Sequence, residues 1–105
     1  MSRLIHKLPE ARQDLVEIAD YLAQDSLSPS DRFLEAADKT FEFLGSMPDI
    51  GSPWESENPA LAGLRVWPVS GFKRYLVFYR STEDSIQIVR VLHAARDIES
   101  IFDLE

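Results

Sequence analysis

The sequence predicts an α+β fold in which an antiparallel helical hairpin packs on a mainly antiparallel four-stranded sheet. The first half of the chain repeats apolar residues at helical spacing, in two stripes separated by a short polar link. The second half holds apolar and aromatic runs of strand length, bounded by turn residues. These observations predict the order β-α-α-β-β-β and a short C-terminal helix, in a single domain of residues 1–105.

The helical hairpin is predicted from two stripes and their flanking residues. Pro9 suits the first position of a helix, where its missing N–H costs nothing. The first stripe is Ala11, Leu15, Ile18 and Leu22. Ser28 is expected to cap the second helix, with Pro29 at its first position, and the stripe that follows is Phe33, Ala37, Phe41 and Leu44. The short link at residues 25–27 makes the two helices antiparallel.

The sheet is predicted from four apolar runs. We expect the strands at about residues 3–8, 64–69, 73–80 and 85–93. An extended loop rich in proline and glycine spans residues 48–63, and a polar hairpin turn lies at residues 81–84. Because the last two strands are apolar on both sides, both faces of the sheet must be covered.

Strict alternation along the strands divides their side chains between these two faces. One face would hold Phe72, Leu76, Phe78, Ile86, Ile88 and Leu92. The other would hold Trp67, Tyr75, Val77, Tyr79, Val89 and Val91. The helical hairpin can cover only one of them. The other face is either a surface for a partner or is covered by the long loop and a terminal helix that contains Ile98, Ile101 and Phe102.

Composition and charge restrict the class of protein. The net charge of −7 argues against non-specific nucleic-acid binding. It is unevenly spread, because residues 1–60 carry 5 basic and 12 acidic side chains whereas residues 61–96 carry 6 basic and 2 acidic ones. No apolar run is long enough for a membrane span, the start lacks the long apolar region of a secretion signal, and cysteine is absent. We therefore expect a cytoplasmic protein.

Motifs for cofactor, metal or nucleophile chemistry are absent from the sequence. There is no phosphate-binding glycine loop and no nucleophile elbow. The only histidines are His6 and His93, which lack the spacing of metal ligands, so we expect neither a metal nor a cofactor. The acidic residues Glu10, Asp14 and Glu17 are interpreted as the solvated face of the first helix.

A set of basic residues on the predicted strands carries the chemistry that remains. Its members are Arg65, Lys73, Arg74, Arg90 and Arg96, which lie among Trp67, Phe72, Tyr75, Tyr79 and His93. Arginine among aromatic rings suits an acidic protein surface or nucleic acid, and such a site could also cleave RNA without a metal. The alternative is that these arginines pair with acids within the fold.

The order of these features resembles the RelE/ParE toxin superfamily, and most closely its ParE branch. The resemblance covers nearly the whole chain. It is carried by Ala11, Asp14-Leu15, Ile18, Tyr21-Leu22, Met47-Pro48, Ile50-Gly51, Leu64-Arg65, the strands at residues 75–80 and 88–93, and Arg96-Asp97.

The resemblance implies the toxin of a bacterial type II toxin–antitoxin pair, with roles in plasmid stabilisation and stress response. ParE-like members act on DNA gyrase, so we expect a gyrase-binding protein rather than an enzyme. The expected gyrase contacts are Arg65, Arg74, Arg90, His93 and Arg96. A cognate antitoxin would neutralise the toxin and alone carry the contact to operator DNA. The expected antitoxin contacts are Trp67, Tyr75, Val77 and Tyr79.

Two alternatives follow from the same resemblance. RelE-like members cut ribosome-bound mRNA with basic strand residues, a late arginine and a C-terminal tyrosine. Lys73, Arg74 and Arg96 occupy comparable places here, but the residue nearest that tyrosine is Phe102, which has no hydroxyl for proton transfer. The other alternative is an inactive homologue that only binds antitoxin.

Overall fold

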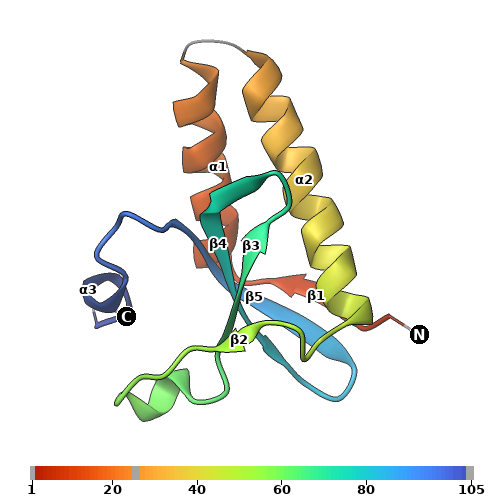
Figure 1. Ribbon diagram of the computed structural model, residues 1–105, viewed down its shortest axis with the longest axis vertical. Coiled ribbons are helices and arrows are strands. Elements are labelled where there is room, and N and C mark those ends of the chain that lie inside the picture. Colours follow the sequence, from red (N-terminus) through yellow and green to blue (C-terminus); the bar gives the residue numbers. More distant parts are fainter. Residues whose placement is uncertain (1, 25–26, 104–105) are drawn as a thin grey trace.

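The computed structural model describes residues 2–24 and 27–103 of the chain (Figure 1). Its elements are β1 (Leu4–Lys7), α1 (Pro9–Ala23), α2 (Leu27–Ser46), β2 (Ser52–Pro53), the 3₁₀ turn η1 (Pro59–Leu61), β3 (Arg65–Val69), β4 (Phe72–Ser81), β5 (Ser85–His93) and α3 (Ile98–Asp103). The predicted link at residues 25–27 lies mostly outside the described residues. In the described part of the chain, no helix is long and apolar enough to cross a membrane.

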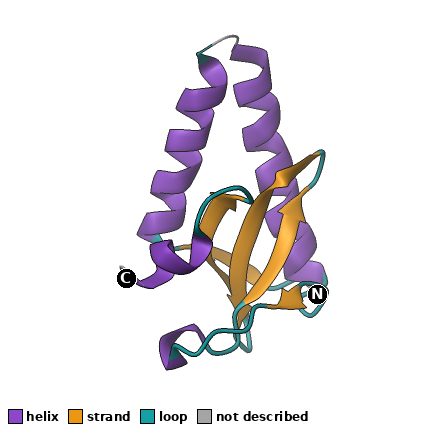
Figure 2. Ribbon diagram, turned by 60° about the vertical axis from the view of Figure 1, so that its left-hand side comes forward, coloured by secondary structure: helices purple, strands orange, loops and turns teal. Residues whose placement is uncertain are grey.

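The helical hairpin forms as the two apolar stripes predict. α1 and α2 lie side by side and antiparallel, and in both views their outer ends extend past the sheet (Figures 1 and 2). The buried stripe residues are Ala11, Leu15, Phe33, Ala37, Phe41 and Leu44. Pro9 opens α1 after an extended Leu8, as expected. α2 begins at Leu27, so the predicted cap Ser28 lies within the helix.

The sheet has five strands in the order β1-β5-β4-β3-β2, one more than expected. β1 pairs in parallel with β5, and the other neighbours are antiparallel. The additional strand, β2, is two residues long and lies inside the loop predicted to be extended. The Trp54 N–H continues this pairing by donating to the Leu64 carbonyl oxygen over 2.8 Å. The predicted α+β class is confirmed.

A β-bulge in β5 changes which side chains face the helices. Tyr79 pairs with Ile88 whereas Phe78 pairs with Arg90, so Val89 is an extra residue on β5. The extra residue shifts the alternation by one position. Ile86 and Ile88 therefore lie in the cluster under the helices and Val89 lies on the second face, so the assignment from strict alternation is wrong for these three residues. It is also wrong for Phe72 on β4, which packs against the cluster under the helices.

The second face of the sheet is covered by the chain itself. Its buried cluster consists of Leu61, Leu64, Phe78, Val89, Leu92, Ile98 and Phe102. The ring of Phe78 meets Trp54 edge-on at a centroid distance of 5.2 Å and Phe102 at 5.3 Å. In Figure 1 the loop with η1 lies at the end of the molecule away from the hairpin tip, and α3 lies to the side of the sheet. Of the two readings left open by the sequence, the structure shows cover by the long loop and α3.

Candidate functional site

Arg65, an expected gyrase contact, is engaged within the fold. It lies opposite Tyr79 on β4, and its Nη1 donates to the carbonyl oxygens of Gly51 (2.7 Å) and Asp49 (3.2 Å). The Tyr79 hydroxyl donates to the Pro48 carbonyl over 2.9 Å and accepts from the Gly51 N–H over 2.8 Å. Burial raises the pKa of Tyr79 above its usual value. Together these bonds fasten residues 48–51 to the sheet.

Asp14 and Arg90 form a buried ion pair that joins α1 to β5. Asp14 is 3% exposed and accepts from the Arg90 Nε and Nη2, both at 2.7 Å. Its Oδ2 also accepts from the Val91 N–H at 2.9 Å, directly after the bulge. The prediction that Asp14 is solvated is wrong. The sequence held a signal for this, because position 14 shares its helix face with Ala11, Leu15 and Ile18.

The same pair changes the interpretation of Arg90. The fork of its guanidinium is directed at the two carboxylate oxygens of Asp14, and its side chain is 14% exposed. A bidentate guanidinium–carboxylate pair uses the donors that would otherwise recognise an acidic partner. Arg65 and Arg90 therefore support the fold, and the exposed basic surface comes from other residues.

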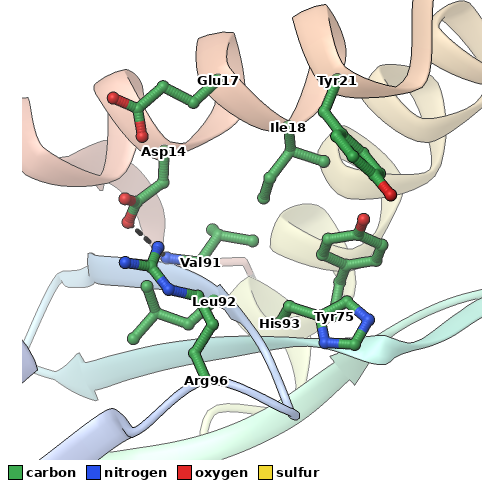
Figure 3. A pocket seen from close by; sticks show the side chains of 9 residues that line it. All are labelled: Asp14, Glu17, Ile18, Tyr21, Tyr75, Val91, Leu92, His93 and Arg96. Atoms are coloured by element: carbon green, nitrogen blue, oxygen red, sulfur yellow. Dashed lines mark hydrogen bonds between the residues drawn. The ribbon is translucent and has the colours of Figure 1, made fainter.

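The described residues form a cavity of about 420 Å³ between α1 and the end of β5 (Figure 3). It is lined by Asp14, Glu17, Ile18, Tyr21, Tyr75, Val91, Leu92, His93 and Arg96. Figure 3 shows Tyr21 and Tyr75 pointing toward each other and Arg96 extending from the segment after β5 toward α1.

Aromatic residues form one side of this cavity. The rings of Tyr75 and His93 meet edge-on with centroids 5.0 Å apart. Burial, and secondarily the neighbouring Tyr21, raise the pKa of Tyr75. The Tyr75 phenol therefore keeps its proton at neutral pH. The His93 Nδ1 accepts from the Ala95 N–H over 3.0 Å, which orders the corner that carries Arg96.

The exposed members of the predicted basic set lie around this cavity and a neighbouring hollow. A second hollow of about 440 Å³ is lined by Gly71, Phe72, Lys73, Arg74, Tyr75 and His93, so it shares Tyr75 and His93 with the first. We call Lys73, Arg74, His93 and Arg96 the basic rim. Within residues 2–24 and 27–103, the side chains of Lys73, Arg74 and Arg96 make no hydrogen bond or ion pair.

The expected antitoxin contacts separate into buried and accessible residues. Val77 and Tyr79 have no exposed surface, because both lie in the cluster under the helical hairpin. They cannot meet a partner in this fold, which corrects that part of the expectation. Trp67 and Tyr75 pack at the edge of the same cluster and are half-buried, so each keeps some accessible surface.

Phe102 belongs to the core of the second face. It is 2% exposed, and it lines neither of the two cavities described above. Its ring packs against Phe78 as part of the cover that α3 provides. The residue nearest the C-terminal tyrosine of RelE-like enzymes is therefore an apolar core residue.

The chain belongs to the family described as the ParE toxin of the type II toxin–antitoxin system parDE, whose model matches residues 5–98. None of the curated proteins matches the chain.

Solved structures share this fold. A chain of the chromosomal ParDE system from P. aeruginosa superposes with a TM-score of 0.68 at 19% identity, over 88% of this chain and 96% of that one. A chain of the RelBE2 toxin–antitoxin complex from Mycobacterium tuberculosis superposes with a TM-score of 0.59 at 23% identity, over 89% of this chain and 99% of that one. At these identities the likeness is one of fold.

Proposed function

We propose that this protein inhibits DNA gyrase in the cytoplasm by protein–protein contact and is neutralised by a cognate antitoxin. The main support for the proposal is Phe102. Its side chain has no hydroxyl and is 2% exposed in an apolar cluster. The proton-transfer group expected of a RelE-like nuclease is therefore missing from that position. Family membership supports the toxin class and does not distinguish between the two targets.

The basic rim is the surface proposed to meet gyrase. Lys73, Arg74 and Arg96 are exposed on a chain whose net charge is −7, so they form a local cationic surface on an acidic protein. Exposed guanidinium groups recognise carboxylates in a bidentate manner and raise association rates with acidic surfaces. A partner would therefore bind here through Arg74 and Arg96, while Arg65 and Arg90 maintain the fold.

One observation favours a second candidate, a metal-independent ribonuclease. Tyr21, Tyr75, His93 and Arg96 meet around one cavity, where a cation and several proton-transfer groups lie within the same space. A protonated Tyr75 could donate a proton to a leaving oxygen, and Arg96 could stabilise charge on a phosphate. Glu17 lies in the same lining and would repel the phosphates of RNA.

Supercoiling and DNA-cleavage assays with purified gyrase distinguish the two candidate functions. We expect the wild-type protein to block supercoiling and to stabilise gyrase-cleaved DNA. Arg74→Glu and Arg96→Glu should each weaken inhibition by about tenfold or more, because a cation at an acidic contact becomes repulsive. Arg12→Glu is the matched control, since Arg12 is exposed on α1 and lines neither cavity.

Two results would contradict the proposal. Cleaved mRNA with gyrase unaffected would favour the ribonuclease, and Tyr75→Phe should then reduce cleavage. Normal growth after induction of the gene alone would indicate an inactive homologue that only binds antitoxin. Under the gyrase hypothesis, Phe102→Tyr should leave inhibition unchanged in protein that remains folded.

A further inference from the structure

The chain leaves β5 through a tight turn, residues 93–96, whose backbone is bonded at both ends. The Arg96 N–H donates to the His93 carbonyl oxygen over 3.0 Å, which closes the turn. The Ala94 N–H donates to the Arg74 carbonyl oxygen over 2.7 Å, which fastens the start of the turn to β4. We call residues 93–96 the β5 corner.

The imidazole of His93 supplies a third bond in the β5 corner. Its Nδ1 accepts from the Ala95 N–H over 3.0 Å. Asparagine and aspartate at the first position of a turn make the same bond to the backbone two residues further on. Because a backbone N–H can only donate, Nδ1 must be unprotonated, and the neutral ring carries its proton on Nε2.

The position of Arg96 depends on this corner more than that of Arg74 does. Arg96 is exposed, and in the described part of the chain its guanidinium makes no hydrogen bond or ion pair. The direction in which it extends toward α1 (Figure 3) is therefore set by the backbone of the β5 corner. The backbone at Arg74 is held by its place in β4, where Tyr75 pairs with His93.

Histidine differs from asparagine at the first position of a turn because it can gain a proton. A charged imidazole has two N–H donors and no acceptor, so it cannot accept from the Ala95 N–H. The edge-on contact with Tyr75, at a centroid distance of 5.0 Å, needs only the ring. Protonation therefore acts on the bond to the corner. Histidine is the side chain whose charge changes most readily between about pH 5 and pH 8.

The charged and titratable groups around His93 come from three parts of the fold. They are Asp14, Glu17 and Tyr21 on α1, Lys73, Arg74 and Tyr75 on β4, and Arg96 in the corner itself. Asp14 is already paired with Arg90, and Asp97, directly after the corner, accepts from the Ser100 hydroxyl. Protonation has two opposing effects on an acidic partner, because it adds a positive charge to the basic rim and releases the turn that places Arg96.

We infer that neutral His93 is a positioning residue for Arg96, and that protonation of His93 weakens the contact with gyrase. This inference rests on the proposed function, which supplies the partner. A guanidinium binds a carboxylate through two parallel bonds, so the contact depends on the orientation of the guanidinium. One more charge on an exposed rim is screened by water and salt and contributes little. The loss of orientation therefore outweighs the added charge.

Two substitutions of His93 separate the acceptor from the ring. His93→Asn retains an acceptor for the Ala95 N–H and removes the ring, whereas His93→Phe retains the ring and removes the acceptor. We expect His93→Phe to weaken inhibition of purified gyrase by roughly three- to tenfold, the effect of one lost hydrogen bond, and His93→Asn to weaken it less. Stronger inhibition by His93→Phe than by His93→Asn would mean that gyrase contacts the ring itself, and would overturn the inference.

The pH dependence is a readout that a purely structural role of the ring would not change. Between about pH 8 and about pH 5.5, the affinity of the wild type for gyrase divided by that of His93→Asn should fall by about threefold or more. The ratio removes the effect of pH on gyrase. His6→Asn is the matched control, because His6 is the other histidine, is exposed and lines neither cavity. The ratio of wild type to His6→Asn should stay constant.

A rise of the first ratio on acidification would show that the added charge dominates, which would contradict the inference. NMR of the protein alone tests the corner without gyrase. On acidification, the exchange of the Ala95 amide relative to its intrinsic rate should quicken in the wild type and stay constant in His93→Asn. The amides of α2 should keep their protection, which reports that the domain remains folded.

The NMR measurement separates failure of the inference from failure of the proposed function. Constant protection of the Ala95 amide while His93 gains its proton would overturn the inference, whatever gyrase does. An Ala95 amide that responds to pH, in a wild-type protein that does not inhibit gyrase, would contradict the proposed function instead.

Discussion

The two faces of the sheet are covered in different ways. The helix-covered face is closed by two long helices, α1 and α2, and includes the buried Asp14–Arg90 ion pair. The second face is closed by a loop, the 3₁₀ turn η1 and the six-residue helix α3. Regular helices with a continuous apolar stripe form a cooperative core, whereas short irregular cover opens more easily. The difference indicates that the second face can open while the first remains folded.

The cover of the second face is fastened from the strands. Tyr79 packs its ring under the helices and directs its hydroxyl to Pro48 and Gly51. On the neighbouring position of β4, the Arg80 Nη2 donates to the Ala60 carbonyl of η1 over 3.0 Å. The irregular segment is therefore held by specific polar contacts in addition to its apolar cluster.

The largest expected effect comes from breaking the ion pair of the helix-covered face. Asp14→Ala leaves the half-buried Arg90 without its carboxylate, and we expect a loss of about 3–5 kcal/mol in the free energy of unfolding. Denaturant-induced unfolding measures this free energy. Glu17→Ala, on the same helix but exposed, should change stability by less than about 0.5 kcal/mol. Equal losses in both variants would show that the pair does not support the core.

A smaller and more local effect is expected on the second face. Phe102→Ala removes a ring that is 2% exposed, and we expect the free energy of opening α3 to fall by about 3 kcal/mol. Hydrogen exchange should quicken in α3 and η1 while the amides of α1 and α2 keep their protection. The exposed Glu99→Ala on α3 is the control. Equal loss of protection in α1 would contradict separate opening of the two faces.

Substitutions of two glycines, Gly51 and Gly63, test how tightly the loop before β3 packs against the sheet. A Cβ on Gly51 would lie 2.5 Å from the Tyr79 hydroxyl oxygen, so Gly51→Ala should cost about 2 kcal/mol through overpacking. Gly63 has a φ of +80° and open space around it, so Gly63→Ala should cost about 1 kcal/mol through backbone strain alone. Thermal unfolding of the two variants compares their losses of stability.

Removing the Tyr79 hydroxyl tests whether a clash with Tyr79 causes the loss of stability in Gly51→Ala. Tyr79→Phe combined with Gly51→Ala should recover only part of the loss, because the ring carbons Cε1 and Cζ remain 2.7 and 2.9 Å from the new Cβ. Purely additive losses in the double variant would mean that the two residues do not clash.

The smallest effect is expected at alkaline pH. The folded-state pKa of Tyr79 is raised above 10.0 by burial, so the folded protein holds the phenolic proton more tightly than the unfolded chain. This contribution to stability is complete below about pH 10 and is lost as pH rises through the folded-state pKa. Unfolding curves above pH 10 should show a smaller decline for Tyr79→Phe than for the wild type. Identical declines would contradict a raised pKa.

Much of the fold could be predicted from residues that are close in sequence. The stripes from Ala11 to Leu44 predicted both helices, and Pro9 marked the start of the first. The two-residue strand β2 was missed, because pairing with β3 creates it and its own residues, Ser52 and Pro53, have no strand pattern.

The site was predicted less completely than the fold. The basic residues were found as a set, but nothing in their local sequence separated the exposed Arg74 and Arg96 from the engaged Arg65 and Arg90. Each engaged arginine depends on a partner far along the chain, namely Gly51 for Arg65 and Asp14 for Arg90. Whether an arginine is free for a partner depends on which segments the fold brings beside it.

The sequence by itself determined the helical hairpin, the strand runs and the excess of apolar residues on both faces, because periodicity and chain stiffness act over neighbouring residues. Only the tertiary structure decided what covers the second face, since α3 and the loop must meet Phe78 in space. It also decided that Lys73, Arg74 and Arg96 stay exposed, because pairing of charges is a contact between distant segments and leaves no periodic trace in the chain.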